Sequence, residues 1–278
     1  MNTIEKAQRL SEIGIAPIEK ELCRRSFSYF CKWVFEEIYR KEYDFAYHVA
    51  ILCDIIGKVY TGQIQNVVIN IPPRYYKTEH ISILFPAWCY ANNPRCNFII
   101  TSYSDDLALK NSNNVKRIIS SVPFEAMFGK ILGKEESAKK LWSTVHGGGL
   151  RASSAASSIT GFGAGTADER IFGGCLIIDD PNKANDYQSE VMLDKVVDNY
   201  ENVLSTRLNS KITPVVVIMQ RIHENDLAGH LLSGKSVSGK FEHIKLSALK
   251  EQEELSYDTR KVDEPLYQKN MIRKSWMR

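Results

Sequence analysis

The segment 72–78, with the sequence PPRYYKT, lies between a short apolar run and a stretch of helical spacing. A phosphate-binding loop has this form, with a strand, a turn, and then one lysine and one hydroxyl where a helix begins. Lys77 would contact the β- and γ-phosphates of a nucleotide, and Thr78 would hold Mg²⁺. The usual pattern G-x-x-x-x-G-K-[ST] has glycine where this chain has Ile71 and Tyr76. The segment by itself therefore also fits an ordinary strand-to-helix turn.

Two adjacent carboxylates end a second apolar run, CLIIDD at 175–180. A buried strand ends in adjacent acids at a cost unless they face a site, because burying unpaired charge is unfavourable. In ATPases with a phosphate loop, an acid in the position of Asp179 binds Mg²⁺ and one in the position of Asp180 orients the attacking water. The alternative is a strand that leaves the core through an Asp-Asp-Pro turn. The order of the two elements along the chain favours a nucleotide site.

Alternating strands and helices would position these residues. Short apolar runs rich in β-branched residues predict four buried strands, at 66–71, 97–101, 175–179 and 213–219. Helical spacing predicts helices in the first 60 residues, directly after Lys77, over 105–122 and over 191–208. This alternation predicts an α/β fold with a central, mostly parallel sheet covered on both faces. Residues 147–170, rich in Gly, Ser and Ala, have the composition of a flexible surface loop.

The composition is that of an ordinary globular protein, with 278 residues of which 44% are hydrophobic and 25% charged. No apolar run approaches the roughly 18 residues of a spanning helix, and the N-terminus lacks the apolar stretch of a signal peptide. We therefore expect a cytoplasmic protein that does not bind membranes. The six cysteines form no CxxC pair, so we expect reduced core residues. A net charge of +3 neither requires nor excludes binding to nucleic acid.

Several segments between about residue 45 and residue 250 resemble, in order, the large terminase subunits of tailed phages and related prophages. They are NVVINIPPRYYKT, TSYSDDLA, GGGLRASS with SITGFGAG, LIIDDPNKANDYQSE, and NVLSTRLNS with VVVIMQRIHENDLAGHLL. The string Gln-Arg-x-His-Glu-x-Asp-Leu-x-Gly at 220–229 is the most specific of these, because core packing alone does not generate it. In that family Pro-Pro-Arg replaces the first glycine of the phosphate loop.

The resemblance implies a P-loop NTPase fold of the ASCE type that hydrolyses ATP with Mg²⁺. In this fold, the nucleotide would be bound by five consecutive residues, Arg74, Tyr75, Tyr76, Lys77 and Thr78. Thr78 and Asp179 would hold the metal. Asp180 would be the catalytic carboxylate, at a position where many members of the family carry glutamate, and Lys77 and Gln220 would act with it.

The resemblance also implies a coupling motif that senses the γ-phosphate through Gln220 and Arg221. His223, Glu224 and Asp226 would stabilise this turn, with His223 as a hydrogen-bonded structural residue. An arginine from a neighbouring subunit would stabilise charge in the transition state. Arg151 is the first candidate for that arginine, because it lies in the Gly-rich motif, and Arg117 and Arg170 are the alternatives.

The family's function would make the chain a motor subunit that packages double-stranded DNA into a procapsid. The subunits would form a homo-oligomeric ring on the portal protein, with the small terminase subunit as a partner, in the cytoplasm of a bacterial host. Two alternatives stay open: a prophage remnant that binds partners without hydrolysing ATP, and another P-loop DNA translocase or helicase.

We expect three parts: an N-terminal helical segment at 1–60, an ATPase domain at 61–250, and a polar and basic tail or linker at 251–278. The nuclease domain of the family is expected to be absent, because such a domain needs well over about 100 residues. The acids after Lys250 would be solvated charges. They are Glu251, Glu253, Glu254, Asp258, Asp263 and Glu264.

Overall fold

Seven strands form one sheet in the computed structural model, which describes residues 15–133, 140–157, 159–168, 170–252 and 255–267. The order across the sheet is β3-β4-β2-β5-β6-β1-β7. The bounds are β1 (Asn66–Asn70), β2 (Asn97–Ser102), β3 (Leu141–Ser143), β4 (Gly149–Ser154), β5 (Leu176–Asp179), β6 (Val215–Met219) and β7 (Glu242–Lys245). All neighbouring pairs are parallel except β3 with β4. The prediction of an α/β fold with a mostly parallel sheet is confirmed.

The four predicted strands are β1, β2, β5 and β6, and they occupy the middle of the sheet together with β4. Three strands were not predicted. The composition of 147–170 favours a surface loop, but Gly149–Ser154 within it forms β4, between β2 and β3. The small residues here let the backbone pack closely, since a Cβ at Gly148 would overlap the carbonyl oxygen of Pro94.

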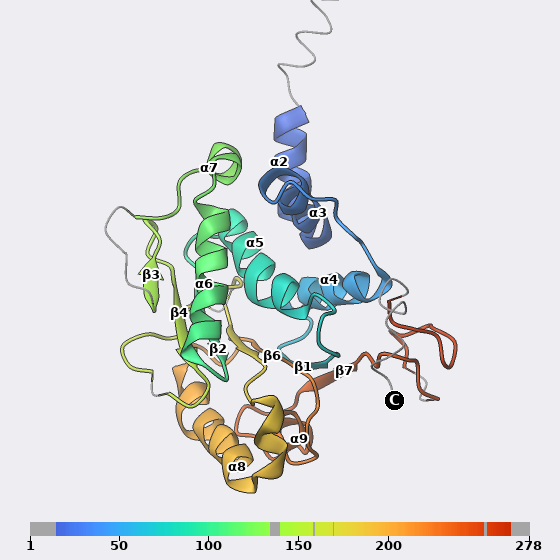
Figure 1. Cartoon of the computed structure of the whole chain (residues 1–278). Helices are drawn as coiled ribbons and strands as arrows, with labels where there is room; N and C mark the ends of the chain where they lie inside the picture. The colour runs from blue at the N-terminus through green and yellow to red at the C-terminus, as the bar shows by residue number, and fades with distance from the viewer. Residues whose placement is uncertain (1–14, 134–139, 158, 169, 253–254, 268–278) are drawn as a thin grey trace, which may run out of the picture.

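Helices cover both faces of the sheet (Figure 1). The described helical segments are α2 (Ile15–Arg25), α3 (Phe27–Trp33), η1 (Val34–Ile38), α4 (Tyr47–Tyr60), η2 (Glu79–Leu84), α5 (Phe85–Asn92), α6 (Asp105–Ile119), α7 (Val122–Phe128), η3 (Ala184–Gln188), α8 (Glu190–Asn199), η4 (Tyr200–Leu204), η5 (Ser205–Arg207) and α9 (Leu227–Leu232). The predicted helices after Lys77, over 105–122 and over 191–208 are confirmed, with bounds that differ by a few residues.

Alternate residues of each central strand point into two separate apolar clusters. On β6, Val216 and Ile218 join the larger cluster, which includes side chains of α3, α4, α5 and α6. Val215 and Val217 join the smaller cluster, which includes side chains of α8 and α9. Because both faces are buried, the strand has a continuous apolar sequence and not an alternating one.

The N-terminal helices share the larger cluster with β1, through residues such as Phe30, Leu52 and Val67. All six cysteines are free and buried, which confirms that they are core residues. Within the described part of the chain, every helix is too short or too polar to span a lipid bilayer.

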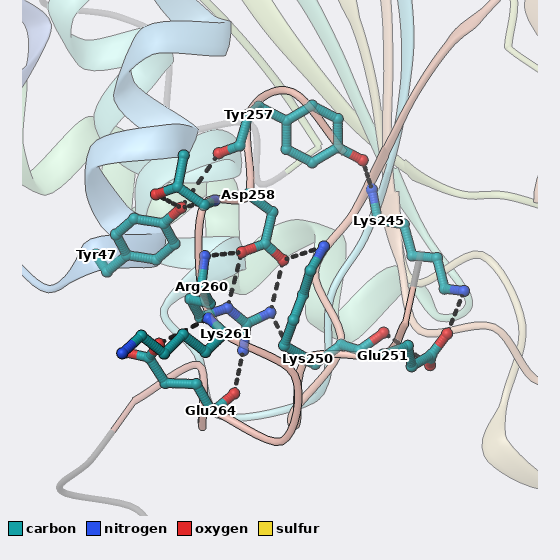
Figure 2. Close-up of polar contacts among 11 residues, drawn as sticks. Tyr47, Lys245, Lys250, Glu251, Tyr257, Asp258, Arg260, Lys261 and Glu264 are labelled. Atoms are coloured by element: carbon teal, nitrogen blue, oxygen red, sulfur yellow. Dashed lines mark hydrogen bonds and ion pairs between the residues drawn. The ribbon is translucent and has the colours of Figure 1, made fainter. Parts of the chain in front are cut away.

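Residues 249–252 and 255–267, called the C-terminal strap below, pack back onto the body of the protein. Leu249 pairs with Pro265, and the amide of Leu266 donates to the carbonyl oxygen of Ala248. The hydroxyl of Tyr47 in α4 accepts a hydrogen bond from the amide of Thr259. The same hydroxyl donates to the carbonyl oxygen of Tyr257 (Figure 2). The tail predicted at 251–278 is described only up to Tyr267, and the basic residues from Lys269 onward lie outside the described residues.

The expectation that the acids after Lys250 are solvated is wrong for Asp258. This residue is 4% exposed, and its carboxylate accepts two hydrogen bonds from Arg260, at 2.8 and 2.9 Å. The ammonium of Lys250 lies 3.6 Å away (Figure 2). Arg260 also donates to the carbonyl oxygens of Glu264 and Ser247. The acid is therefore buried as part of a satisfied ion cluster, which lowers the cost of removing it from water.

Candidate functional site

The predicted phosphate loop, residues 71–78, leaves the carboxyl end of β1 and enters η2, which continues directly into α5. Arg74 and Tyr76 have positive φ angles of 70° and 59°. This left-handed region disfavours residues that carry a Cβ, which explains why glycine is usual at the position of Tyr76. The ring of Tyr75 is buried against His48, whereas the side chains of Arg74 and Tyr76 are exposed.

Lys77 is the only charged residue of the loop that is buried, at 5% exposed. Its ammonium nitrogen lies 2.5 Å from Oδ1 of Asp180, directly after β5. Asp180 has a φ of 44°, and its amide donates to the carbonyl oxygen of Ile218. This backbone turn ends the strand and directs the two adjacent acids to different partners. The structure thus brings together the lysine and the second acid that the sequence placed about 100 residues apart.

Asp179 faces the helix that follows the loop. Its carboxylate accepts hydrogen bonds from the Thr78 hydroxyl at 3.2 Å, the Ser82 hydroxyl at 2.8 Å and the Asn111 amide at 3.2 Å. Burial, and then repulsion by Asp180, raise the pKa of Asp179 to about 6, although the Lys77 charge and these hydroxyl donors act in the opposite direction. A buried carboxylate beside a hydroxyl is a set of oxygen ligands that suits Mg²⁺.

Gln220 follows β6 at the same edge of the sheet, and its backbone amide donates to Oδ1 of Asp180 at 3.3 Å. Asp180 therefore contacts both the loop after β1 and the turn after β6. This is the physical link between the candidate catalytic carboxylate and the predicted coupling motif.

The turn after Gln220 is held by Asp226, which is fully buried. Its carboxylate accepts from the amides of Ile222 and Gly229 and from the guanidinium of Arg221. Arg221 also donates to the carbonyl oxygens of two residues in the turn, His223 and Glu224. The guanidinium is thus used to hold the turn in this state.

The remaining residues of the coupling motif have structural contacts. The Nδ1 of His223 accepts a hydrogen bond from the amide of Asn225. The Glu224 side chain is exposed. A Cβ at Gly229 would collide with the carbonyl oxygen of Glu224, so the turn requires glycine there.

The three candidates for a trans-acting arginine lie in different settings. Arg151 is in the middle of β4 opposite Ile99, and its Nε is buried without a hydrogen-bond partner within the described chain. Arg117 is exposed, and its guanidinium lies over the ring of Tyr39. Arg170 is exposed and pairs with Asp168. Arg117 and Arg170 are thus exposed, whereas Arg151 is partly buried.

Two residues that contact Asp179, Ser82 and Asn111, were not predicted from the sequence. Asn111 lies on the buried face of α6 between Ala108 and Val115. A polar residue at an apolar position of an amphipathic helix was the available signal for it. Ser82 lies four residues after Thr78, one helical turn further along.

Within the described residues, no group of three or more His, Cys, Asp or Glu side chains could hold a metal ion. Comparison of the sequence with models of known protein families gives no match, and comparison with curated proteins gives no significant match.

Proposed function

We propose that this chain binds ATP with Mg²⁺ at the carboxyl edge of its sheet and hydrolyses it, as a P-loop NTPase of the ASCE type. The observation that carries the proposal is the double contact between the loop after β1 and the end of β5. Lys77 pairs with Asp180, and Thr78 contacts Asp179. Phosphoryl transfer from a nucleotide uses a lysine, a hydroxyl and two acids of this kind. Here the lysine and the hydroxyl lie at the start of a helix, and each contacts one of the two adjacent acids.

The residues present fit these ligands. Mg²⁺ is usually held by only one or two protein oxygens together with phosphate oxygens and water, so a site without three converging acids is suitable. Thr78 and Asp179 would provide the protein oxygens. The buried ammonium of Lys77 and the exposed guanidinium of Arg74 would neutralise phosphate charge. Mg²⁺ would neutralise charge that develops on the phosphate oxygens.

The protein groups around the nucleotide would orient the attacking water. Asp180 accepts hydrogen bonds from Lys77 and from the amide of Gln220, so its carboxylate is fixed in direction. Such a carboxylate would hold and polarise a water molecule for attack on the γ-phosphate. Because Gln220 begins the turn that Asp226 and Arg221 hold, loss of the γ-phosphate would be transmitted to that turn.

We further propose that hydrolysis drives the packaging of double-stranded DNA, as in large terminase subunits. The partners would be the portal protein, the small terminase subunit and further copies of this chain in a ring. The order of the five motifs and the Gln220–Gly229 turn support this proposal. DNA would be contacted mainly through its phosphates, because a motor must act on any sequence.

A specific observation favours one alternative, a remnant without ATPase activity. Tyr76 has a φ of 59° where a glycine would be unstrained, and such strain fits a loop that no longer binds phosphate. A helicase or another P-loop DNA translocase is the other alternative, and strand separation would identify a helicase.

ATP turnover by the purified chain tests the proposal, measured alone, with double-stranded DNA, and with DNA and portal protein. We expect turnover that DNA and portal stimulate and that Lys77→Ala abolishes. Lys58→Ala is the matched control, because Lys58 forms an exposed pair with Asp54 on α4. A wild-type chain that binds no Mg-ATP at millimolar concentration would overturn the proposal.

A further inference from the structure

A hydrogen-bonded chain of side chains reaches the strained residue of the phosphate loop from the buried side. The Nδ1 of His80 lies 2.9 Å from the carbonyl oxygen of Tyr76, and the Nε2 of the same ring lies 3.0 Å from the hydroxyl of Tyr43. His80 is 1% exposed. The rings of Tyr76 and His80 also meet edge to face, with centroids 6.4 Å apart.

The chemistry of the partners fixes the direction of both hydrogen bonds. A carbonyl oxygen can only accept, so Nδ1 of His80 carries the proton and donates to Tyr76. The bare Nε2 then accepts from the Tyr43 hydroxyl. Both bonds are made by a neutral ring and a neutral hydroxyl, and His80 is buried where a charge on the ring would be costly.

The contact falls on one of the two loop residues with a positive φ, the other being Arg74. Tyr76 has a φ of 59° and directly precedes Lys77. A residue with a Cβ leaves this conformation readily unless its surroundings hold it. The carbonyl oxygen of Tyr76 accepts from the ring of His80 and also from the backbone amide of His80 at 3.1 Å. Together these two bonds oppose rotation of the peptide group between Tyr76 and Lys77.

We propose that Tyr43 and His80 are positioning residues that hold Tyr76 in its left-handed conformation and thereby shape the loop for the phosphates of a nucleotide. This inference rests on the proposed function, because it assumes that the loop binds phosphates. In most loops of this kind a glycine adopts the conformation without help. Here the hydrogen-bonded side chains of Tyr43 and His80, called the Tyr43–His80 relay below, hold the conformation that a glycine would adopt unaided.

The first experiment needs no nucleotide. Nitrogen-15 NMR of the histidine rings in the full chain reports which ring nitrogen of His80 carries the proton. We expect the neutral form protonated at Nδ1, and in Tyr43→Phe a changed chemical shift of the bare Nε2, which loses its hydrogen-bond donor. A wild-type His80 protonated at Nε2, or an unchanged spectrum in Tyr43→Phe, would overturn the relay.

The second experiment is a double-mutant cycle on Mg-ADP affinity. His80→Ala should weaken affinity by about tenfold, because the loop then spends most of its time in other conformations. In the Tyr76→Gly background the same change should cost less than about threefold, because glycine adopts positive φ without strain. A residue that only stabilised the fold would show the same loss in both backgrounds, and that result would overturn the proposal.

Two further variants separate positioning from folding. His80→Asn places an amide donor near the position of Nδ1 and should keep affinity within about threefold of the wild type. Tyr39→Phe is the control for Tyr43→Phe, because the Tyr39 hydroxyl bonds Glu79, one residue before His80, and does not reach Tyr76. We expect Tyr43→Phe to weaken affinity by about threefold and Tyr39→Phe to leave it unchanged. Equal losses in the two variants would count against the relay.

The two experiments also distinguish this inference from the proposed function. If the wild-type chain binds no Mg-ADP at millimolar concentration, the proposed function fails, whereas the tautomer of His80 still decides whether the relay holds Tyr76.

Discussion

The ammonium nitrogen of Lys77 lies 2.5 Å from Oδ1 of Asp180, joining the ends of two strands that β6 separates. If the loop binds a nucleotide as proposed, this carboxylate lies where a phosphate oxygen would contact the lysine. Under the proposed function, a phosphate of the nucleotide would share Lys77 with Asp180, whose carboxylate the amide of Gln220 also holds. The Lys77–Asp180 pair thus ties the loop after β1 to the end of β5.

Replacing Asp180 with asparagine separates binding from chemistry. Asparagine keeps the size of the side chain and releases Lys77 for the phosphates, so we expect Mg-ATP affinity to stay within about threefold of the wild type. Turnover should fall by about 10²–10⁴-fold, because the group that polarises the water is lost. Equilibrium binding and single-turnover kinetics measure the two effects. Asp54→Asn, on the exposed face of α4, is the control, and full turnover in Asp180→Asn would show that the catalytic carboxylate is a different residue.

Binding of Mg-nucleotide should weaken as the pH falls, because burial and the neighbouring Asp180 raise the pKa of Asp179 to about 6. Mg²⁺ binds the ionised carboxylate, so we expect full affinity above about pH 7 and a decline of up to about tenfold per unit below pH 6. Titrations with Mg-ADP between about pH 5 and pH 7.5 measure this decline. Asp179→Asn should weaken binding and remove this pH dependence. A pH-independent affinity in the wild type would exclude Asp179 as the metal ligand.

The raised pKa of Asp179 also affects the stability of the protein without ligand. Affinity for Mg-nucleotide should increase as the pH rises, whereas this stability should decrease. The folded state holds a proton on Asp179 that the unfolded state releases at its ordinary pKa of 3.8. The contribution of this group to the free energy of unfolding is therefore fully present below pH 3.8 and is lost as the pH rises through about 6.

The central sheet could be predicted because its strands carry a local signal. β1, β2, β5 and β6 are buried on both faces and so consist of continuous apolar runs. β4 is equally central in the pairing but has the sequence GLRASS, whose small and polar residues resemble a loop. β7 lies at the edge of the sheet with two exposed residues in four, so its sequence has no apolar run. Tertiary pairing determines these strands, and local sequence does not reveal it.

The residues of the candidate site likewise differ in whether the local sequence marks them. Lys77 and the acids after β5 stand next to apolar runs, and the parallel sheet necessarily brings the carboxyl ends of its strands to one edge. By contrast, Tyr43 and His80 lie on segments without such a marker, and their relation to Tyr76 depends on how η2 packs against the N-terminal helices. The ion cluster of Asp258 also could not be predicted from the sequence, because Asp258 and its partners lie in a polar segment without an apolar run.

We predict that this chain alone does not cleave DNA. Metal-dependent cleavage needs several carboxylates that rigid elements hold close to one or two ions. Asp179 is surrounded by hydrogen-bond donors of the candidate ATP site, and Asp258 is neutralised by Arg260 and Lys250. Incubation of plasmid DNA with the purified chain and Mn²⁺ or Mg²⁺ tests this. A linear product that Glu251→Ala or Asp258→Ala abolishes would reveal a nuclease site in the strap.

The last prediction concerns the stability that the C-terminal strap gives to the fold. Asp258→Ala would leave the guanidinium of Arg260, whose side chain is 3% exposed, buried without its counter-charge. Removing one partner of a buried ion pair costs about 3–5 kcal/mol, so we expect a large loss in the free energy of unfolding. Glu251→Ala is the matched control in the same segment, because Glu251 pairs with Lys245 while 56% exposed and should cost less than about 1 kcal/mol.

The ion cluster of Asp258 should contribute less to the free energy of unfolding as the pH falls. Burial by itself raises the pKa of Asp258, but the hydrogen bonds and charge of Arg260, with the charge of Lys250, leave the pKa below its ordinary value of 3.8. The stabilisation is therefore present above pH 3.8 and is lost as the pH falls through the lowered pKa. Urea unfolding at about pH 7 and about pH 3 measures this loss, which Asp258→Ala should not show. Equal destabilisation by Asp258→Ala and Glu251→Ala at neutral pH would mean that the strap detaches without cost and that the buried cluster does not stabilise the fold.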